Sequence, residues 1–269
     1  MVKMSVGTKL NFVVLLFFIA LMTTTIALAA APKGLVGHWH LDEGTGKIAK
    51  DSSTEKNDGE LWAGAKWVKE GVDKGGNFTG KGLAFKPPSG LNIPAQGVDS
   101  LEQVTAGITL SAWIKILGPP TEDQGNIVAK PGSYYLVYRE GKLGMYLYGP
   151  SDDGGLGYKT GKTKLPLNKW MHVALTYDQK KIFLYLDGKV DFSTSAKEAI
   201  KTRNNEAFVG IGVERKKSRL FHGMIDEVMI YANVGLSQEE IQDKLIDQVL
   251  PVNPSDKLAV SWGIIKAER

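Results

Sequence analysis

Residues 170–188 read WMHVALTYDQKKIFLYLDG, and this stretch decides the fold. It contains two short apolar runs, 170–177 and 181–186. In the second run Ile182, Leu184 and Leu186 fall on one face, as the two-residue side-chain period of a half-buried strand requires. Asp187-Gly188 then supplies the glycine with positive φ that a tight hairpin turn needs. The stretch therefore predicts consecutive β-strands joined by tight turns.

The same pattern extends outward, with short β-like runs separated by turn residues from Leu35 to Tyr231. Glu140-Gly141 marks a second hairpin turn, between two tyrosine-rich runs. The chain has 31 glycines, 11 prolines and no long helical pattern, which predicts a sandwich or a barrel. The clearest strands are expected at 108–117, 134–139, 142–148, 170–177, 181–186, 207–213 and 221–231.

A single helix is expected near the end of the chain. Ser237 is a candidate N-cap with Glu240 three residues further on, the signature of a capping box. Apolar residues follow at helical spacing, namely Ile241, Leu245 and Val249. We expect this helix to cap or trail the sandwich, and residues 250–269 to form a linker and a short tail.

Six sequence blocks, in a fixed order, carry a resemblance to a known family. They are residues 35–46 (LVGHWHLDEGTG) with 51–53 and 57–59, then 108–115 (ITLSAWIK), 170–178 (WMHVALTYD), 184–188 (LYLDG), 223–231 (GMIDEVMIY) and 236–241 (LSQEEI). The chain resembles secreted bacterial proteins with a LamG-like jelly-roll domain, of the concanavalin A-like lectin/glucanase superfamily. This resemblance implies an all-β, two-sheet antiparallel jelly-roll sandwich with a short C-terminal helix, over about residues 35–245. It says little about function, because lectins, adhesion modules and hydrolases share this scaffold.

The tryptophans of these blocks are expected in the core. Trp39, Trp113 and Trp170 lie in alternating strands, where each can bury about 150–250 Å² between two sheets. His172 lies between Met171 and Val173 and is expected to be a hydrogen-bonded structural histidine.

The N-terminus has the pattern of an export signal. Lys3 and Lys9 precede an apolar run, and Ala27-Leu28-Ala29 is a small-x-small cleavage pattern. We therefore expect residues 1–29 to be a signal peptide, 30–249 to be the jelly-roll domain, and the mature protein to be secreted, periplasmic or on the cell surface. The alternative is an uncleaved membrane anchor, whereas no stable membrane insertion is expected once the signal is removed.

Charge and cysteine content exclude several classes of function. The net charge of +4 falls to +2 without Lys3 and Lys9, and the charges are scattered apart from 215–219, so nucleic acid is not an expected partner. The chain has no cysteine, which excludes disulfides, thiolate metal sites and a cysteine nucleophile.

No catalytic motif is present. Glycosidases of the sandwich type carry an acid-x-acid-x-x-acid run that aims two carboxyl groups at one face, and no Glu-x-Asp-x-x-Glu occurs here. Asp42-Glu43 and Asp226-Glu227 are adjacent pairs, whose side chains point to opposite faces of a regular strand. The sequence therefore predicts that the chain is not an enzyme.

Tyrosines concentrate in the hairpin around Glu140-Gly141. Tyr146 and Tyr148 share a face, as do Tyr134 and Tyr138, with Arg139 at the rim. Aromatic faces beside polar groups suit sugar rings, so these five residues are the candidate ligand site. The alternative is that tyrosines simply fit half-buried strands.

Asp226 interrupts an apolar strand, and a buried acid must be hydrogen-bonded or bound to a cation. The resemblance implies a structural calcium held by Asp226 with oxygens near Asp42 and Gly80, a mixture that calcium accepts. The alternative is that Asp226 accepts backbone N–H bonds, and Asp51 is either a further ligand or a turn former. His38 and His40 share one side of a strand and can chelate a metal, but the sequence identifies no third ligand.

These observations predict an exported, non-catalytic recognition module that binds carbohydrate or an extracellular matrix component, with calcium as a stabilising ion. A glycoside hydrolase or polysaccharide lyase with an atypical site is the alternative from another class. A purely structural or adhesive domain is a third.

Overall fold

The computed structural model describes residues 33–71, 82–86, 89–95, 98–150, 156–201, 208–214 and 218–247. The chain divides into two units, residues 1–30 and 31–269, and all described residues belong to the second. The expected signal segment at 1–29, the linker and tail at 250–269, and Gly80 lie outside the described residues.

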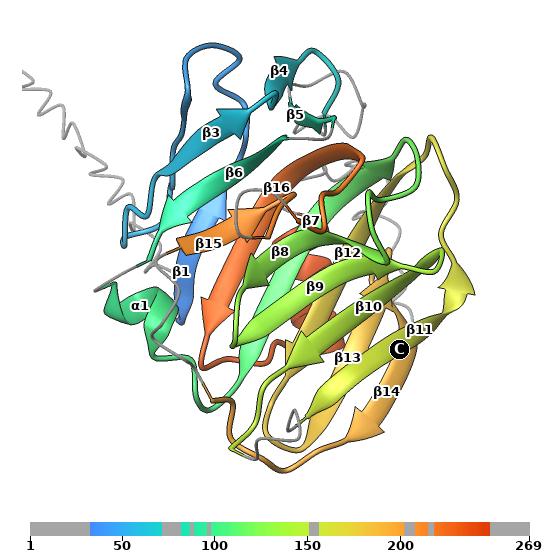
Figure 1. Cartoon of the computed structure of the whole chain (residues 1–269). Helices are drawn as coiled ribbons and strands as arrows, with labels where there is room; N and C mark the ends of the chain where they lie inside the picture. The colour runs from blue at the N-terminus through green and yellow to red at the C-terminus, as the bar shows by residue number, and fades with distance from the viewer. Residues whose placement is uncertain are drawn as a thin grey trace, which may run out of the picture. The chain divides into compact units, whose positions relative to one another are not determined.

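The described part forms two antiparallel sheets that face each other, as the sequence predicts (Figure 1). The first sheet runs in the order β14 (Lys189–Ser195), β13 (Lys181–Leu186), β12 (Trp170–Tyr177), β7 (Ile108–Ile116), β16 (Gly223–Ala232), β5 (Gly82–Phe85) and β4 (Lys66–Val68), and β1 (Leu35–Trp39) also pairs with β16. The second sheet runs in the order β11 (Gly157–Lys164), β10 (Lys142–Leu147), β9 (Tyr134–Arg139), β8 (Gln124–Lys130), β15 (Phe208–Ile211), β6 (Ser89–Pro94), β3 (Gly59–Ala63) and β2 (Ile48–Ala49). This is the jelly-roll sandwich that the six blocks imply.

The main core lies between the sheets, and alternation along the strands builds it. In β7 the residues Ile108, Leu110, Ala112, Ile114 and Ile116 are all fully buried in this core. Strands β9, β12 and β13 have the bounds expected from the sequence. The period-2 pattern therefore fixes which side of each strand faces inward.

Two of the three tryptophans do not lie between the sheets, which corrects the expectation for them. Trp39 is fully buried in the main core. Trp113 and Trp170 belong to a second apolar cluster with Leu236 and Leu245, on the face of the first sheet turned away from the other sheet. We call this the outer face of the sheet. Trp113 points there because its neighbour in the strand, Ile114, points into the core.

The C-terminal helical segment covers that second cluster. It comprises α2 (Gln238–Glu240) and η1 (Ile241–Ile246), a more widely wound turn. The expected capping box is confirmed, because the Ser237 hydroxyl accepts the backbone N–H of Glu240 at 3.2 Å and the Ser237 N–H donates to the Glu240 carboxylate at 2.9 Å. One more short helix, α1 (Asp99–Glu102), links β6 to β7. No helix among the described residues is long and apolar enough to cross a membrane.

Candidate functional site

The β9–β10 hairpin determines where the tyrosines lie. Its turn, Glu140-Gly141, joins Arg139 to Lys142 as the first pair, so Tyr146 stands opposite Tyr135 and Leu147 opposite Tyr134. Residues directly opposite each other in an antiparallel pair share a face. Tyr146 and Tyr148 therefore share the outer face of the second sheet with Tyr135.

The structure does not bring the five predicted ligand-site residues together. Tyr134 and Tyr138 belong to the main core, and Tyr134 is fully buried. They point inward because their partners across the hairpin, Leu147 and Leu143, do so too. Tyr146, Tyr148 and Arg139 are at the surface, so the candidate site keeps these three and loses the other two.

Four tyrosines form the surface that we call the tyrosine face, namely Tyr135, Tyr146, Tyr148 and Tyr158. The last three are half-buried and pack against the buried side chains of Ala129, Tyr135 and Val137. The Tyr146 and Tyr148 rings are 4.6 Å apart between centroids and tilted by 49°, and each lies about 6 Å from the Tyr135 ring. The Arg139 guanidinium lies over the Tyr158 ring at 4.7 Å, a cation–π geometry.

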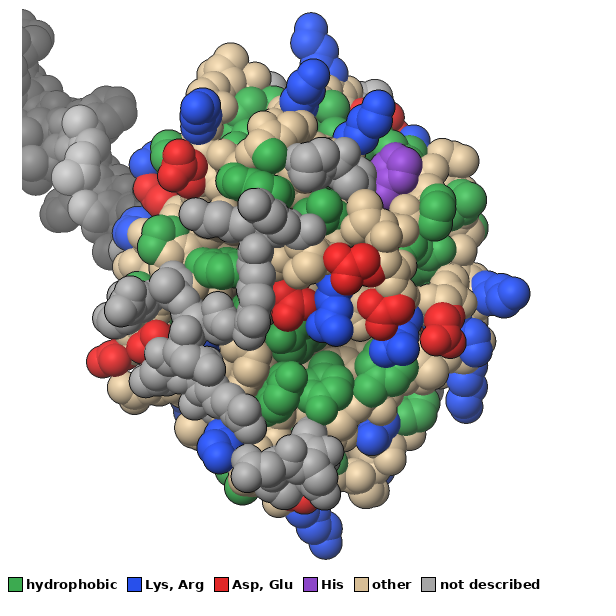
Figure 2. Space-filling model, viewed as in Figure 1, with side chains coloured by type: hydrophobic (Ala, Val, Ile, Leu, Met, Phe, Trp, Pro, Cys, Tyr) green, Lys and Arg blue, Asp and Glu red, His purple; other side chains and the backbone are tan. Residues whose placement is uncertain are grey.

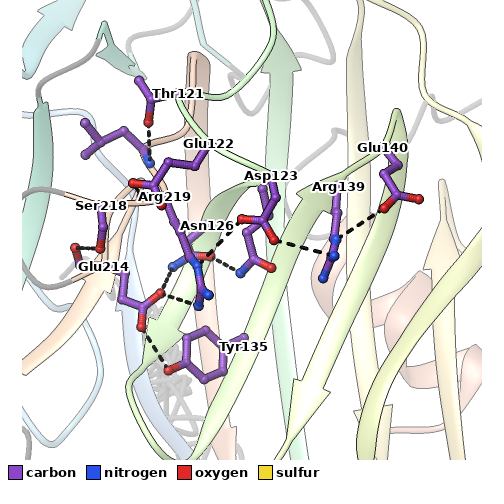
Figure 3. A network of polar contacts seen from close by, with 12 residues as sticks. Thr121, Glu122, Asp123, Asn126, Tyr135, Arg139, Glu140, Glu214, Ser218 and Arg219 are labelled. Atoms are coloured by element: carbon purple, nitrogen blue, oxygen red, sulfur yellow. Dashed lines mark hydrogen bonds and ion pairs between the residues drawn. The ribbon is translucent and has the colours of Figure 1, made fainter.

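A polar row borders the tyrosine face, made of Asp123, Asn126, Arg139, Glu214 and Arg219 (Figure 3). Glu214 lies at one end of the row and accepts three hydrogen bonds, from the Arg219 guanidinium at 3.0 Å, the Asn126 amide at 3.2 Å and the Tyr135 hydroxyl at 3.2 Å. Asp123 lies between the two arginines, 3.5 Å from Arg139 and 3.8 Å from Arg219. In Figure 2 a band of acidic and basic side chains runs above hydrophobic side chains that gather over β9 and β10.

Tyr135 joins the two parts of this surface. Its ring supports Tyr146 and Tyr148, and its hydroxyl binds Glu214. Burial, followed by the nearby negative charge of Glu214, raises the pKa of the Tyr135 phenol well above its ordinary value. The phenol therefore stays a neutral donor, and the contact holds β9 to the segment after β15.

The predicted site lacked two residues of the tyrosine face and four of the polar row, namely Tyr135, Tyr158, Asp123, Asn126, Glu214 and Arg219. The signal for Tyr135 was available in the turn, because a two-residue turn at 140–141 fixes which residues face each other. Glu214 carried no local signal, since it meets Tyr135 from 79 positions away along the chain.

The calcium ligands expected from the resemblance are placed as follows. Asp226 is fully buried in β16, Asp42 is exposed, and Gly80 lies outside the described residues. Asp51 is a turn former, because its carboxylate accepts the backbone N–H groups of His38, Ser53 and Asn57.

Asp226 and Glu227 do not lie in regular strand. The pairing of β16 with β7 shifts register between Asp226 and Met229, and Glu227 has φ of +46°. Among the described residues one group of three His, Asp or Glu side chains converges, and it is His38, His40 and Glu227. Glu227 is thus the third group that the sequence did not identify beside the two histidines.

Comparisons with solved structures find the same fold. Domain 4 of AbnA, a GH43 extracellular arabinanase from Geobacillus stearothermophilus solved with arabinotriose, aligns with a TM-score of 0.59 and 20% identity over 80% of this chain and 99% of that domain. The binding domain of Paraclostridial Mosquitocidal Protein 1 aligns with a TM-score of 0.58 and 16% identity, over 78% of this chain and 51% of that one. A Trypanosoma rangeli sialidase mutant with trans-sialidase activity aligns with a TM-score of 0.55 and 19% identity, over 81% of this chain and 34% of that one. At these identities the likeness shows the fold alone.

Sequence comparison identifies the family directly. Curated protein sequences give no match. The family model Laminin_G_3, described as the concanavalin A-like lectin/glucanases superfamily, matches residues 89–242, which is more than half of the 269-residue chain. These residues include β6 to β16, the capping box and the whole tyrosine face. The chain therefore belongs to the concanavalin A-like lectin/glucanases superfamily.

Proposed function

We propose that this chain is a carbohydrate-binding module whose ligand lies on the tyrosine face. The observation that carries the proposal is the pair of half-buried rings, Tyr146 and Tyr148, held against the buried Tyr135 on the outer face of a sheet. Rings supported from below keep one orientation when a ligand arrives, so little conformational entropy is lost on binding.

The polar row supplies the second half of sugar recognition. A sugar ring presents apolar C–H groups on its faces and hydroxyl groups around its edge, so it needs both an aromatic surface and nearby donors and acceptors. Arg139 and Asp123 meet the second need, because they lie beside the tyrosines and remain partly exposed. The arabinanase domain solved with arabinotriose, which has this fold, supports carbohydrate as the ligand class.

A glycan array tests this proposal. The folded chain should retain a defined set of oligosaccharides, and the array should include the glycosaminoglycans of extracellular matrix. Binding that survives the loss of both Tyr146 and Tyr148 would place the site elsewhere. No binding to any glycan would favour the structural or adhesive domain.

A hydrolase or lyase remains the alternative from another class. Incubation with mixed polysaccharides, followed by a reducing-sugar assay, separates it from a binding module. The binding proposal expects no release of sugar, and catalytic release would overturn its non-catalytic part.

We also propose that the domain acts outside the cytoplasm and uses calcium as a structural ion near Asp226. The basic and apolar pattern of residues 1–29 supports the first part. A fully buried carboxylate supports the second, because a buried charge needs compensation from hydrogen bonds or a cation. As the resemblance implies, Asp226 would hold the calcium together with backbone carbonyls near Asp42, a mixture of oxygens that calcium accepts. Gly80, the other expected position, lies outside the described residues.

A further inference from the structure

A cluster of two histidines and one glutamate lies on the first sheet, away from the tyrosine face. His38 and His40 flank Trp39 at the end of β1, and because Trp39 enters the core, both imidazoles point to the outer face. His38 stands opposite Met229 of β16, which also belongs to the apolar cluster on that face.

The bulge in β16 brings the third side chain to the same place. Ile225 and Val228 both enter the main core. The two residues between them, Asp226 and Glu227, occupy the register shift. A bulge of this kind adds a residue to one strand and redirects side chains. Glu227, in a left-handed backbone conformation, is thereby directed at the two histidines.

The three side chains converge closely. His38 Nε2 is 2.7 Å from Glu227 Oε2, and His40 Nδ1 is 3.1 Å from both carboxylate oxygens. The ring centroids of the two histidines are 3.9 Å apart. One ligand atom from each residue lies within 4.8 Å of the others. Ligand atoms on one tetrahedral zinc ion lie about 3.3–3.6 Å apart, given metal–ligand distances of about 2.0–2.2 Å, so only small side-chain rotations would be needed.

We propose that His38, His40 and Glu227 form a binding site for a divalent transition metal of the zinc class. Imidazole nitrogen suits zinc, copper and nickel, whereas calcium and magnesium prefer oxygen ligands alone. Two histidines and one glutamate leave a fourth tetrahedral position for water or another ligand.

The surroundings suit a bound cation. The Glu227 side chain is only 6% exposed, while that of His40 is 36% exposed, so the charged ligand is fixed inside and the entry side is open. A pocket of about 410 Å³ opens beside His40, and its wall carries the acidic residues Asp42 and Glu43 together with Lys50. The Lys50 ammonium pairs with Asp58 at 2.6 Å, so the two acids leave the wall net negative, which raises the local concentration of cations.

The backbone around His38 is already held in place. Its N–H donates to the Asp51 carboxylate at 2.8 Å, and its carbonyl accepts the Ser52 N–H at 2.9 Å. Supporting hydrogen bonds of this kind fix metal ligands in position before the metal arrives. The metal would join β1 to β16 and so connect the N-terminal strand to the last strand of the sheet.

Titration calorimetry with zinc chloride at pH 7, on chain that carries no histidine tag, tests the proposal. We expect one zinc ion per chain, and binding that persists in excess calcium. His40→Ala should weaken zinc binding by about 100-fold or more, since even the loss of a supporting partner costs about 10–100-fold. His40 is partly exposed and lies just beyond the end of β1, so this variant is a mild change to the fold. Glu227→Gln, which keeps the shape of the side chain, should weaken binding similarly.

His222→Ala is the matched control, because His222 is a partly exposed histidine that lies in a different pocket with Lys66 and Lys86. It should bind zinc as the unmodified chain does. Cobalt in place of zinc should add a visible absorption band that His40→Ala abolishes. The proposal is overturned if no stoichiometric binding is found, or if folded His40→Ala binds as tightly as the unmodified chain. In either case the three side chains are only a hydrogen-bonded cluster.

Discussion

At the scale of the residue, His172 shows how strongly burial sets protonation in this domain. It is fully buried in β12, with its Nε2 2.8 Å from the Ser111 hydroxyl and its ring 5.6 Å from that of Trp113. Burial lowers the pKa of its imidazole from 6.5 to about 3. His172 is thus the hydrogen-bonded structural histidine that the sequence predicts, and its ring is neutral in the folded chain.

The first prediction concerns acid stability. As pH falls below about 6.5, the unfolded chain binds a proton at His172 while the folded chain does not, until pH approaches about 3. His172 therefore contributes stability above pH 6.5 that is lost on acidification, by about 1.4 kcal/mol per pH unit. We expect the free energy of unfolding in urea to fall between pH 6.5 and 5.

His172→Gln should remove this part of the pH dependence, although it lowers stability at pH 7. His222→Gln, the control, should keep it. If the free energy of unfolding falls equally steeply with pH in His172→Gln and in the unmodified chain, burial of His172 does not cause the loss of stability in acid.

The second prediction concerns the tyrosine face. Tyr146→Ala and Tyr148→Ala should each weaken a ligand found on the array by about 1–3 kcal/mol, the scale of aromatic stacking on planar ligands. Both rings lie on the surface, so the variants should remain folded, which circular dichroism can check. Titration calorimetry with the best array ligand measures the loss of affinity.

Phe183→Ala is a matched control for these two variants. Phe183 is a partly buried aromatic residue that stacks on Tyr185 at 5.8 Å, in the first sheet. Its loss should leave glycan affinity unchanged. If Phe183→Ala lowers glycan affinity as much as Tyr146→Ala does, the binding surface is not the tyrosine face.

The sequence shows which tyrosines share a face of their strand, but it does not show which face is turned outward. Alternation correctly pairs Tyr134 with Tyr138 and Tyr146 with Tyr148. The turn at 140–141 places Tyr135 and not Tyr134 opposite Tyr146, but which of the two faces turns outward depends on how the second sheet lies against the first. The contacts of Glu214 could not be predicted, because they depend on how β15 and the following segment lie on β8 and β9.

At the scale of the element, the C-terminal helix was predictable because its start is encoded locally. Ser237 and Glu240 satisfy each other's backbone N–H groups within one turn. The bulge at Asp226 and Glu227 was not predictable, since the sequence GMIDEVMIY reads as a continuous strand. A bulge appears only when β16 pairs with β7 and with β1.

The third prediction tests the helix cap. Ser237→Ala leaves the Glu240 N–H without its side-chain acceptor, which should lower the free energy of unfolding by about 0.5–2 kcal/mol. Urea unfolding followed by tryptophan fluorescence is a suitable measurement, because Trp113 and Trp170 lie under this helical segment. Ser237→Thr keeps the hydroxyl, so its free energy of unfolding should fall much less. Equal losses for the two variants would argue against the capping hydrogen bond.

At the scale of the whole molecule, the fold was predictable because six blocks and a period-2 pattern agree on two sheets. The position of Trp113 and Trp170 outside the main core was harder to predict, because it requires knowing that the helical segment covers the first sheet. Successive side chains of β7 point to opposite faces, so Ile114 lies in the main core and Trp113 lies under the C-terminal helical segment.

The fourth prediction concerns export. If residues 1–29 act as a signal, chain recovered from a secreting bacterial host should begin at Ala30. Intact-mass analysis measures this directly. Retention of residues 1–29 in membrane fractions would support the anchor instead.

The fifth prediction concerns calcium as a stabiliser of the whole sandwich. Asp226 is fully buried where β16 pairs with Trp113 of β7, beside the residues that pair with β1. An ion there would join the last strand to the rest of the sheet. Binding to the folded state alone stabilises it by RT ln(1 + [Ca]/Kd), about 2.7 kcal/mol at a hundredfold excess over Kd. We therefore expect chelation to lower the melting temperature by about 5–10 °C, at about 2–4 °C per kcal/mol.

Adding calcium back to chelated chain should restore the melting temperature, and two variants separate this ion from the transition metal. Asp226→Asn keeps the shape but removes the charge, so it should abolish the response to calcium. His40→Ala should retain the response to calcium, because an imidazole is not a preferred calcium ligand. The hydrogen bond of His40 is to Glu227, the proposed zinc ligand. Identical melting of the unmodified chain in calcium and in chelator would contradict the calcium proposal. The Asp226 carboxylate would then be compensated by protein groups alone, since a buried charge of this kind does not persist without compensation.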